Sequence, residues 1–281
     1  MSRVVALLLS TFVVAACSNG SAAPASSTGT PATPAFSQAP AGGSIELTVY
    51  GAASLKGVLD KIRAAYETAV PGTTLRISTD SSAALDTQIE QGAPADVFLS
   101  ADTTNPRRLV EKGLTAGPAV AFAGNTLTVI VPIANRARIS TPADLAGTGV
   151  KVIAAGDAVP ITRYAAQLIA NLARRPDYPA DFTAGYASNI ASKEDNVAAV
   201  VAKVETGDGD GAIVYVTDAK KSTKVTTVPV PDDANVPATY AGVVVGSSHH
   251  PDAAKAFMTW LTGRDGQAIL GSFGFLAPPA S

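Results

Sequence analysis

Four short stretches place small side chains and backbone amides where a predicted strand gives way to a helix. They read GAAS (51–54), DSSA (80–83), AVPIT (158–162) and KEDNV (193–197). Each helix start offers up to about four N–H groups without an intrahelical partner, together with a partial positive charge. Several such ends aimed at one point would bind an anion without any lysine or arginine. The simpler alternative is that Ser54 and Ser82 are ordinary helix N-caps, a role that serine often has.

No catalytic or metal-binding motif competes with these junctions. The two histidines, His249 and His250, are adjacent ahead of a predicted helix, where neighbouring positions seldom chelate one ion. DGDG (208–211) has part of a calcium loop but lacks its remaining ligands, so a tight turn explains it better. No serine-hydrolase, zinc-protease or nucleotide-binding motif stands where it should. We therefore predict a binding protein that is not an enzyme and that needs neither a cofactor nor direct cation ligands.

The elements that would position the junctions alternate between strand and helix from Ile45 onward. The predicted strands cover residues 45–50, 74–79, 95–101, 125–132, 150–156, 211–219, 224–231 and 238–246. Helical periodicity puts one apolar face on the residues after the first junction, namely Leu55, Val58, Leu59, Ile62 and Tyr66. Further helices are predicted at 83–92, up to about 112, and at 160–174, 194–207 and 251–270. This alternation predicts an α/β fold with mostly parallel sheets, whose ligands bind at the carboxyl ends of strands.

The first 43 residues form a separate region. Residues 1–17 have one basic residue and then an apolar stretch, which is the layout of a secretory signal. The segment ends in VAAC (14–17), which resembles a bacterial lipobox in which Cys17 is lipidated. The alternative is an ordinary signal peptide with a chance cysteine. Residues 18–43 are rich in Ser, Ala, Pro and Gly and predict a disordered tether.

Composition limits the class of protein further. The chain has 281 residues and a net charge of −2, which argues against a nucleic-acid partner. After the first segment, no apolar run reaches the roughly 18 to 20 residues of a membrane-spanning helix. The sequence therefore predicts an exported protein that is lipid-anchored to the outer face of the cell membrane.

The junctions taken together resemble the molybdate-binding proteins of bacterial ABC transporters. The matching motifs are TVYGAASL, SSAALDTQIEQGAPADVFLSAD, AVPITRYA, GAIVYVTDA and the closing GSFGF, and similarity runs through nearly all of residues 45–276. The resemblance implies a two-lobed, type II periplasmic-binding-protein fold with the oxyanion in the interlobe cleft, which closes as it binds. The expected lobes are 45–125 plus 236–281 and 126–235.

The ligand-contacting positions of that family fall on five residues of this chain. They are the hydroxyl and amide of Ser54, the hydroxyl of Ser82, the backbone amides of Ile161 and Val197, and the phenolic hydroxyl of Tyr215. Ser54 would then be both a helix cap and a ligand. The resemblance also implies that a monomeric receptor captures molybdate or tungstate and delivers it to an ABC permease in the membrane.

The second and third junctions differ from the family pattern or add a charge to it. Asp80 would place a carboxylate near a dianion unless it turns away to cap the helix or to hydrogen-bond elsewhere, and either Ser81 or Ser82 could be the donor. Arg163 either strengthens anion binding or lies at the surface on the first turn of its helix. Neutral donors suit a fully deprotonated dianion, whereas a protonated anion such as hydrogen phosphate would also need an acceptor. A receptor for sulfate or phosphate stays open as an alternative, as does an exported enzyme or sensor on the same scaffold.

Overall fold

A mixed five-stranded sheet is the centre of the first lobe in the computed structural model, which describes residues 44–279. Its strand order is β2-β1-β3-β10-β4. The strands are β1 (Ile45–Ala52), β2 (Thr73–Asp80), β3 (Val97–Ser100), β4 (Val120–Asn125) and β10 (Ala238–Val244). The predicted signal peptide, Cys17 and the predicted tether lie outside the described residues.

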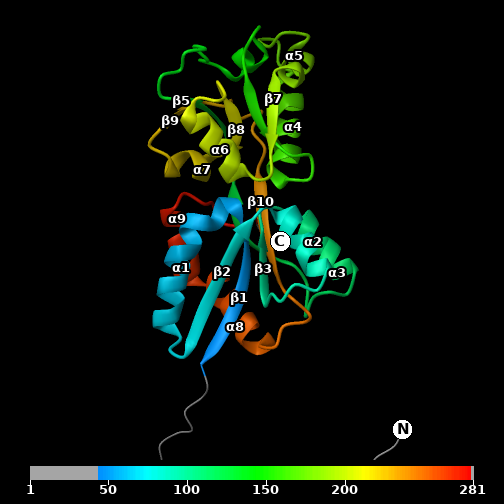
Figure 1. Cartoon of the computed structure of the whole chain (residues 1–281), viewed down its shortest axis with the longest axis vertical. Helices are drawn as coiled ribbons and strands as arrows, with labels where there is room; N and C mark the ends of the chain where they lie inside the picture. Colours follow the sequence, from blue (N-terminus) through cyan, green and yellow to red (C-terminus); the bar gives the residue numbers. More distant parts are fainter. Residues whose placement is uncertain (1–43, 280–281) are drawn as a thin grey trace, which may run out of the picture. The chain divides into compact units, whose positions relative to one another are not determined.

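Helices cover both faces of this sheet (Figure 1). One face carries α1 (Lys56–Ala69), α8 (Pro251–Thr262) and α9 (Arg264–Ser272), and the other carries α2 (Ser82–Glu90) and α3 (Thr104–Glu111). The predicted apolar face of α1 is confirmed, because Val58, Leu59, Ile62 and Tyr66 are buried together with Leu55 of the preceding 3-10 turn. Burial of apolar side chains on both faces fixes the sheet between its helices.

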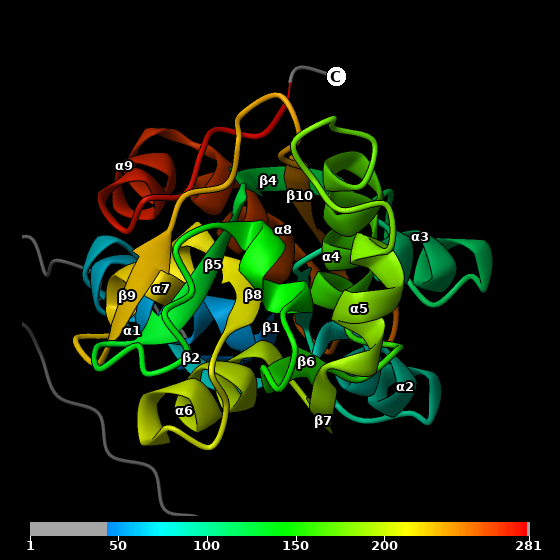
Figure 2. The same cartoon turned by 90° about the horizontal axis from the view of Figure 1, so that it is seen from above.

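The second lobe contains a three-stranded and a two-stranded sheet. The first has the order β8-β5-β9 and the second joins β6 and β7. The strands are β5 (Leu127–Pro132), β6 (Val152–Ala155), β7 (Ile190–Glu194), β8 (Ala212–Tyr215) and β9 (Val225–Val228). The helices are α4 (Pro160–Leu172), α5 (Phe182–Ser188), α6 (Val197–Thr206) and α7 (Val216–Lys221), with a 3-10 turn η2 (Pro142–Ala146). Seen from this end, β5 and β8 lie centrally between α6 and α7 on one side and α4 and α5 on the other (Figure 2).

The chain passes between the lobes twice. It leaves the first lobe after Asn125 and enters β5 at Leu127, and it returns between β9 and β10. Asn235 on the returning segment is bonded to the other crossing, because its side chain accepts from the Leu127 amide at 3.0 Å and donates to the Leu127 carbonyl at 2.9 Å. The two crossings are therefore hydrogen-bonded side by side.

The prediction of mostly parallel sheets is wrong in detail. In the first lobe β1 is parallel to β2 and β3, but β10 is antiparallel to β3 and β4. In the second lobe β5 is antiparallel to both β8 and β9, and β6 is parallel to β7. The physical reason is that β10 returns from the second lobe and enters the first sheet between two existing strands, which reverses its direction.

Three predicted boundaries also need correction. The strand expected over 125–132 is preceded by a separate strand, β4, and Thr126 lies between β4 and β5. The helix expected over 194–207 begins only at Val197, because Glu194 ends β7 and Asn196 caps α6. The strand expected over 211–219 ends at Tyr215, which is the N-cap of α7. Within residues 44–279 no helix has the length and apolar character needed to cross a membrane.

Candidate functional site

All five sequence-predicted site residues line one small cavity between the lobes. The cavity has a volume of about 10 Å³, within about 210 Å³ of atom-free space that is partly continuous with solvent. The lining residues are Ala52, Ala53, Ser54, Ser81, Ser82, Ala101, Val159, Pro160, Ile161, Val197 and Tyr215. The cavity volume is about the room that one water molecule needs, so the cavity excludes large solutes.

Ser54 lies inside a 3-10 turn, η1 (Ala53–Leu55), that follows the end of β1. Its hydroxyl oxygen accepts a hydrogen bond from the Tyr240 hydroxyl at 3.0 Å, and the residue is 1% exposed. The expected cap role is wrong, because the N-cap positions of η1 and α1 are Ala52 and Leu55 and neither has a side-chain cap bond. Since Tyr240 donates to Ser54, the hydroxyl hydrogen of Ser54 can be directed elsewhere, including into the cavity.

The two serines of the second junction differ in their position at the start of α2. Ser81 is the N-cap of α2, and its side chain accepts from the Ala84 amide at 3.2 Å. Ser82 is the first residue of the helix, so the alternative that it is an N-cap is wrong. The Ser82 hydroxyl accepts from the Ala101 amide at 3.0 Å and donates to no protein group within residues 44–279. Each serine hydroxyl therefore accepts one backbone N–H group, and because both residues line the cavity, either hydroxyl can donate its hydrogen to a ligand there.

The second lobe contributes two helix starts. Val159 is the N-cap of α4, Pro160 is in its first turn as predicted, and Ile161 follows. At α6, the side chain of Asn196 accepts from the Ala199 amide at 3.1 Å, and Val197 is the first helical residue. Backbone N–H groups in a first turn have no intrahelical partner, so the amides at Ile161 and Val197 can bind an acceptor in the cavity.

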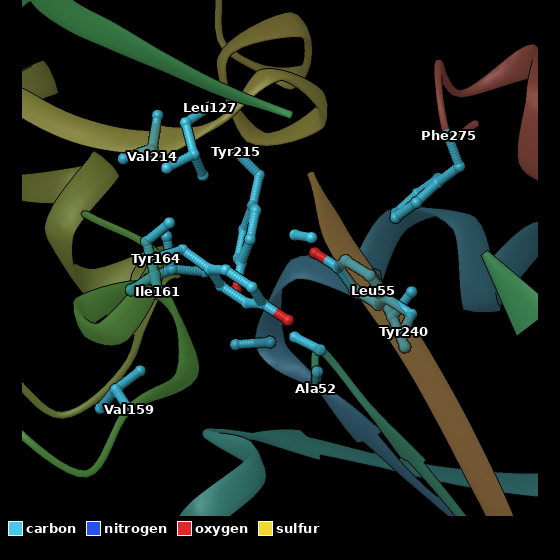
Figure 3. Close-up of a cluster of buried hydrophobic side chains, with 14 of the residues drawn as sticks. Ala52, Leu55, Leu127, Val159, Ile161, Tyr164, Val214, Tyr215, Tyr240 and Phe275 are labelled. Atoms are coloured by element: carbon cyan, nitrogen blue, oxygen red, sulfur yellow. The ribbon is translucent and has the colours of Figure 1, made fainter. Parts of the chain in front are cut away.

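Tyr215 adds a buried phenolic hydroxyl from the end of β8. The residue is 1% exposed, and its oxygen has no hydrogen-bond partner among the described residues. Its ring packs edge-on against Tyr164 and Tyr240, with centroid distances of 6.2 and 5.6 Å (Figure 3). Burial raises the pKa of Tyr215 well above 10, so this hydroxyl stays protonated and can donate at neutral pH. A buried hydroxyl without a protein partner is costly, and a bound acceptor would satisfy it.

The charged residues near the junctions do not line the cavity. Asp80 turns away from it and accepts from the Ser81 amide at 2.7 Å and from the Asn196 side chain at 3.1 Å. Arg163 lies one turn into α4 and pairs with Asp102 of the first lobe at 3.1 Å. Arg163 therefore occupies an exposed position on the first turn of α4, which is one of the two alternatives left open by the sequence, and it does not line the cavity.

The cavity lining is electrically neutral but rich in hydrogen-bond donors. None of its side chains ionises near neutral pH, since the only titratable one is Tyr215. Helix starts from both lobes converge on it and add partial positive charge. In the described part of the chain, no group of three or more His, Cys, Asp or Glu side chains could hold a metal ion. The arrangement can bind a small anion that accepts hydrogen bonds on every side.

Sequence reasoning did not single out several residues of the site. Ala52, Ala53, Ala101, Val159 and Pro160 line the cavity with small or apolar surface. Tyr240 holds the Ser54 hydroxyl from the middle of β10, where it could not be told from a core aromatic. A usable signal existed for the other five, because four of them stand inside the predicted junctions 51–54 and 158–162 and Ala101 directly follows a buried strand.

Comparison with known proteins gives a consistent set of relatives. Residues 47–276 match the family model described as bacterial extracellular solute-binding protein. The chain is 35% identical over 247 residues to the molybdate-binding protein ModA of Mycobacterium tuberculosis, covering 87% of this chain and 90% of that protein.

Among solved structures, the periplasmic molybdate-binding protein of Azotobacter vinelandii has a TM-score of 0.70 at 23% identity, covering 83% of this chain and 99% of that one. The sulfate-binding protein SubI of Mycobacterium tuberculosis has a TM-score of 0.72 at 21% identity, covering 82% and 86%. Both structures share the two-lobed fold.

Proposed function

This chain belongs to the family of bacterial extracellular solute-binding proteins, and we propose that it captures molybdate outside the cytoplasm for uptake by an ABC permease. It is a transport binding protein and not an enzyme. The observation that carries the proposal is the cavity between the lobes, in which neutral donors face one point and the buried Tyr215 hydroxyl has no partner among the described residues.

The chemistry of the donors supports a fully deprotonated oxyanion as the ligand. Ser54, Ser82 and Tyr215 can each donate a hydroxyl hydrogen, and the amides at Ile161 and Val197 donate from helix starts. A tetrahedral dianion accepts hydrogen bonds on all its oxygens, so it can satisfy every one of these groups. Hydrogen phosphate has a proton to donate, and no carboxylate lines the cavity to accept it.

Molybdate and sulfate have the same charge and shape, so donor chemistry alone does not separate them. The solved structures similar in fold include both a molybdate-binding and a sulfate-binding protein, which makes fold a poor guide to the ligand. Sequence relatedness favours molybdate, because the relative that is 35% identical along most of its length is a molybdate-binding protein. Selection against sulfate then rests on cavity size, and tungstate, being almost the same size as molybdate, should bind nearly as well.

The finer features of the receptor complete the proposal. Cys17 would anchor the protein to the outer face of the membrane, with residues 18–43 as the tether to a monomeric receptor. The lobes would be residues 45–125 plus 236–281 and residues 126–235. They would close around the anion, because the five donors come from both lobes.

A ligand panel tests the proposal. The soluble chain from Ser44 is unfolded by heat in the presence of molybdate, tungstate, sulfate or phosphate. A ligand at a hundred times its dissociation constant stabilises the folded state by about 2.7 kcal/mol, which raises the midpoint by a few degrees. Molybdate and tungstate should act and the other two should not. A shift with sulfate alone would make this a sulfate receptor, and no shift with any anion would refute the oxyanion site.

A further inference from the structure

Arg163 makes an ion pair across the two lobes beside the cavity. Its guanidinium, on α4 of the second lobe, lies 3.1 Å from a carboxylate oxygen of Asp102, which follows β3 of the first lobe. The Asp102 side chain is 2% exposed and the Arg163 side chain is 49% exposed. Both residues are next to the site, since Ala101 and Ile161 line the cavity.

Asp102 is held in position by its own lobe. One of its oxygens accepts from the Ser100 hydroxyl at 2.9 Å and from the Asn105 amide at 3.0 Å, and the Asn105 side chain bonds both oxygens. The carboxylate therefore keeps hydrogen-bond donors when the second lobe is removed from it. Arg163 supplies the positive charge, and it does so only while the lobes are together.

Two further polar contacts cross between the lobes around the same cavity. The side chain of Asn196, the N-cap of α6, donates to Asp80 at the end of β2 at 3.1 Å. Lys221 of α7 donates to the backbone carbonyl of Ser54. Each contact is made by, or directly beside, a residue that lines the cavity. The contacts therefore form when the two lobes come together to form the cavity.

We propose that Arg163 is a positioning residue that sets the affinity for the anion by holding the lobes together through Asp102. The inference rests on the proposed function, because it assumes that the ligand lies between the lobes. Arg163 does not line the cavity, so its contribution is to the population of the lobe arrangement that binds. Apparent affinity falls in proportion to the fraction of protein in the binding-competent arrangement.

The expected effect of Arg163→Gln is a loss of affinity through faster release. We expect a dissociation constant for molybdate about 10-fold higher than in the wild type. This is small for breaking a charge pair across an interface, because Arg163 is half exposed and Asp102 keeps its other donors. The higher dissociation constant should come mainly from a faster dissociation rate. That rate is measured by diluting the loaded protein and following the loss of bound molybdenum by rapid filtration and elemental analysis. Arg163→Lys keeps the charge but loses the planar guanidinium, so its dissociation constant should lie between those of the wild type and Arg163→Gln.

Arg174→Gln is the matched control. Arg174 follows the other end of α4 and is exposed, and among residues 44–279 its side chain bonds only Asn171 of its own lobe. This change therefore removes the same charge without touching the interlobe pair. Both glutamine variants should leave the thermal midpoint of the anion-free protein close to that of the wild type. A general loss of positive charge would instead slow binding equally in both variants.

The outcomes separate the inference from the proposed function. A wild-type protein that does not bind molybdate would overturn both. A wild-type protein that binds, with Arg163→Gln binding equally well, would overturn the role of Arg163 alone. A lower midpoint of anion-free Arg163→Gln with an unchanged dissociation constant would also overturn it, because Arg163 would then only stabilise the fold.

Discussion

Replacing Tyr215 by phenylalanine should weaken anion binding without weakening the fold. The change removes one oxygen and leaves the ring, which packs between Tyr164 and Tyr240. That oxygen is buried and has no partner within residues 44–279, so its removal breaks no hydrogen bond of the protein itself. Burial also raises the pKa of Tyr215, so the group lost at neutral pH is a neutral donor and not a charge.

The size of the effect follows from the kind of bond that is lost. A hydrogen bond to a charged group contributes about 1.5 to 3 kcal/mol. Since each 1.4 kcal/mol is tenfold in affinity, the dissociation constant for molybdate should rise about 10- to 150-fold. The unfolding free energy of the anion-free protein should stay equal or rise by up to about 1 kcal/mol, because an unpaired buried hydroxyl has been removed.

Isothermal titration calorimetry with sodium molybdate measures the first quantity and urea unfolding measures the second. Tyr178→Phe is the matched control, because Tyr178 packs against Phe182 in the second lobe and does not line the cavity. It should leave the dissociation constant unchanged. Unaltered affinity in Tyr215→Phe would show that Tyr215 does not donate to the ligand. A fall in anion-free stability of more than about 1 kcal/mol would refute the view that its hydroxyl lacks a partner in the protein.

Three further predictions concern the serines of α2 and the effect of pH on binding and on stability. Ser81→Ala should lower the unfolding free energy by about 1 kcal/mol with little change in affinity, because Ser81 caps α2. Ser82→Ala should raise the dissociation constant for molybdate more than Ser81→Ala does. Calorimetry on both variants decides which serine donates to the anion. The dissociation constant should stay constant between about pH 6 and pH 9, because the one titratable side chain in the lining, Tyr215, has a pKa raised by burial. The pKa of Tyr215 is also higher in the folded protein than the unfolded value of 10.0, so the unfolding free energy should be independent of this group below about pH 10 and should fall as the pH rises above it. Unfolding at a series of pH values should show a steeper fall in the wild type than in Tyr215→Phe.

Much of the fold could be predicted because local periodicity decided it. The buried face of α1 and the start of α4 at a proline follow from residue spacing and backbone chemistry alone. The second lobe was harder to predict from the sequence, since β7 is a short strand of half-buried and exposed residues, including Lys193 and Glu194. Its pairing with β6 is set by contacts distant in sequence, which no local pattern records. The same holds for β10, whose place in the first sheet depends on the return of the chain from the second lobe.

The residues of the cavity could be predicted in position but not in role. Each lies at a strand-to-helix junction, and the structure brings all four junctions and Tyr215 to one point. Which serine caps α2 depends on the backbone angle at Ser81, where the extended conformation makes it the N-cap, and both serines line the cavity. The contact between Tyr240 and Ser54 joins residues 186 positions apart, so it could not be foreseen from spacing.

The separation of neutral from charged groups gives the site a physical rationale. A carboxylate in the lining would repel a dianion, and an arginine there would bind protonated and deprotonated oxyanions alike. In this protein Asp80, Asp102, Arg163 and Lys221 stand outside the lining, and each contacts the opposite lobe. On the proposed assignment, hydrogen bonds from neutral donors to the dianion select the ligand, and the charged contacts around the cavity favour the lobe arrangement that holds it. Salt should therefore act mainly on the second set, since exposed charge pairs are screened while buried neutral donors are not. Because Arg163 is half exposed, raising the ionic strength should reduce the affinity difference between the wild type and Arg163→Gln.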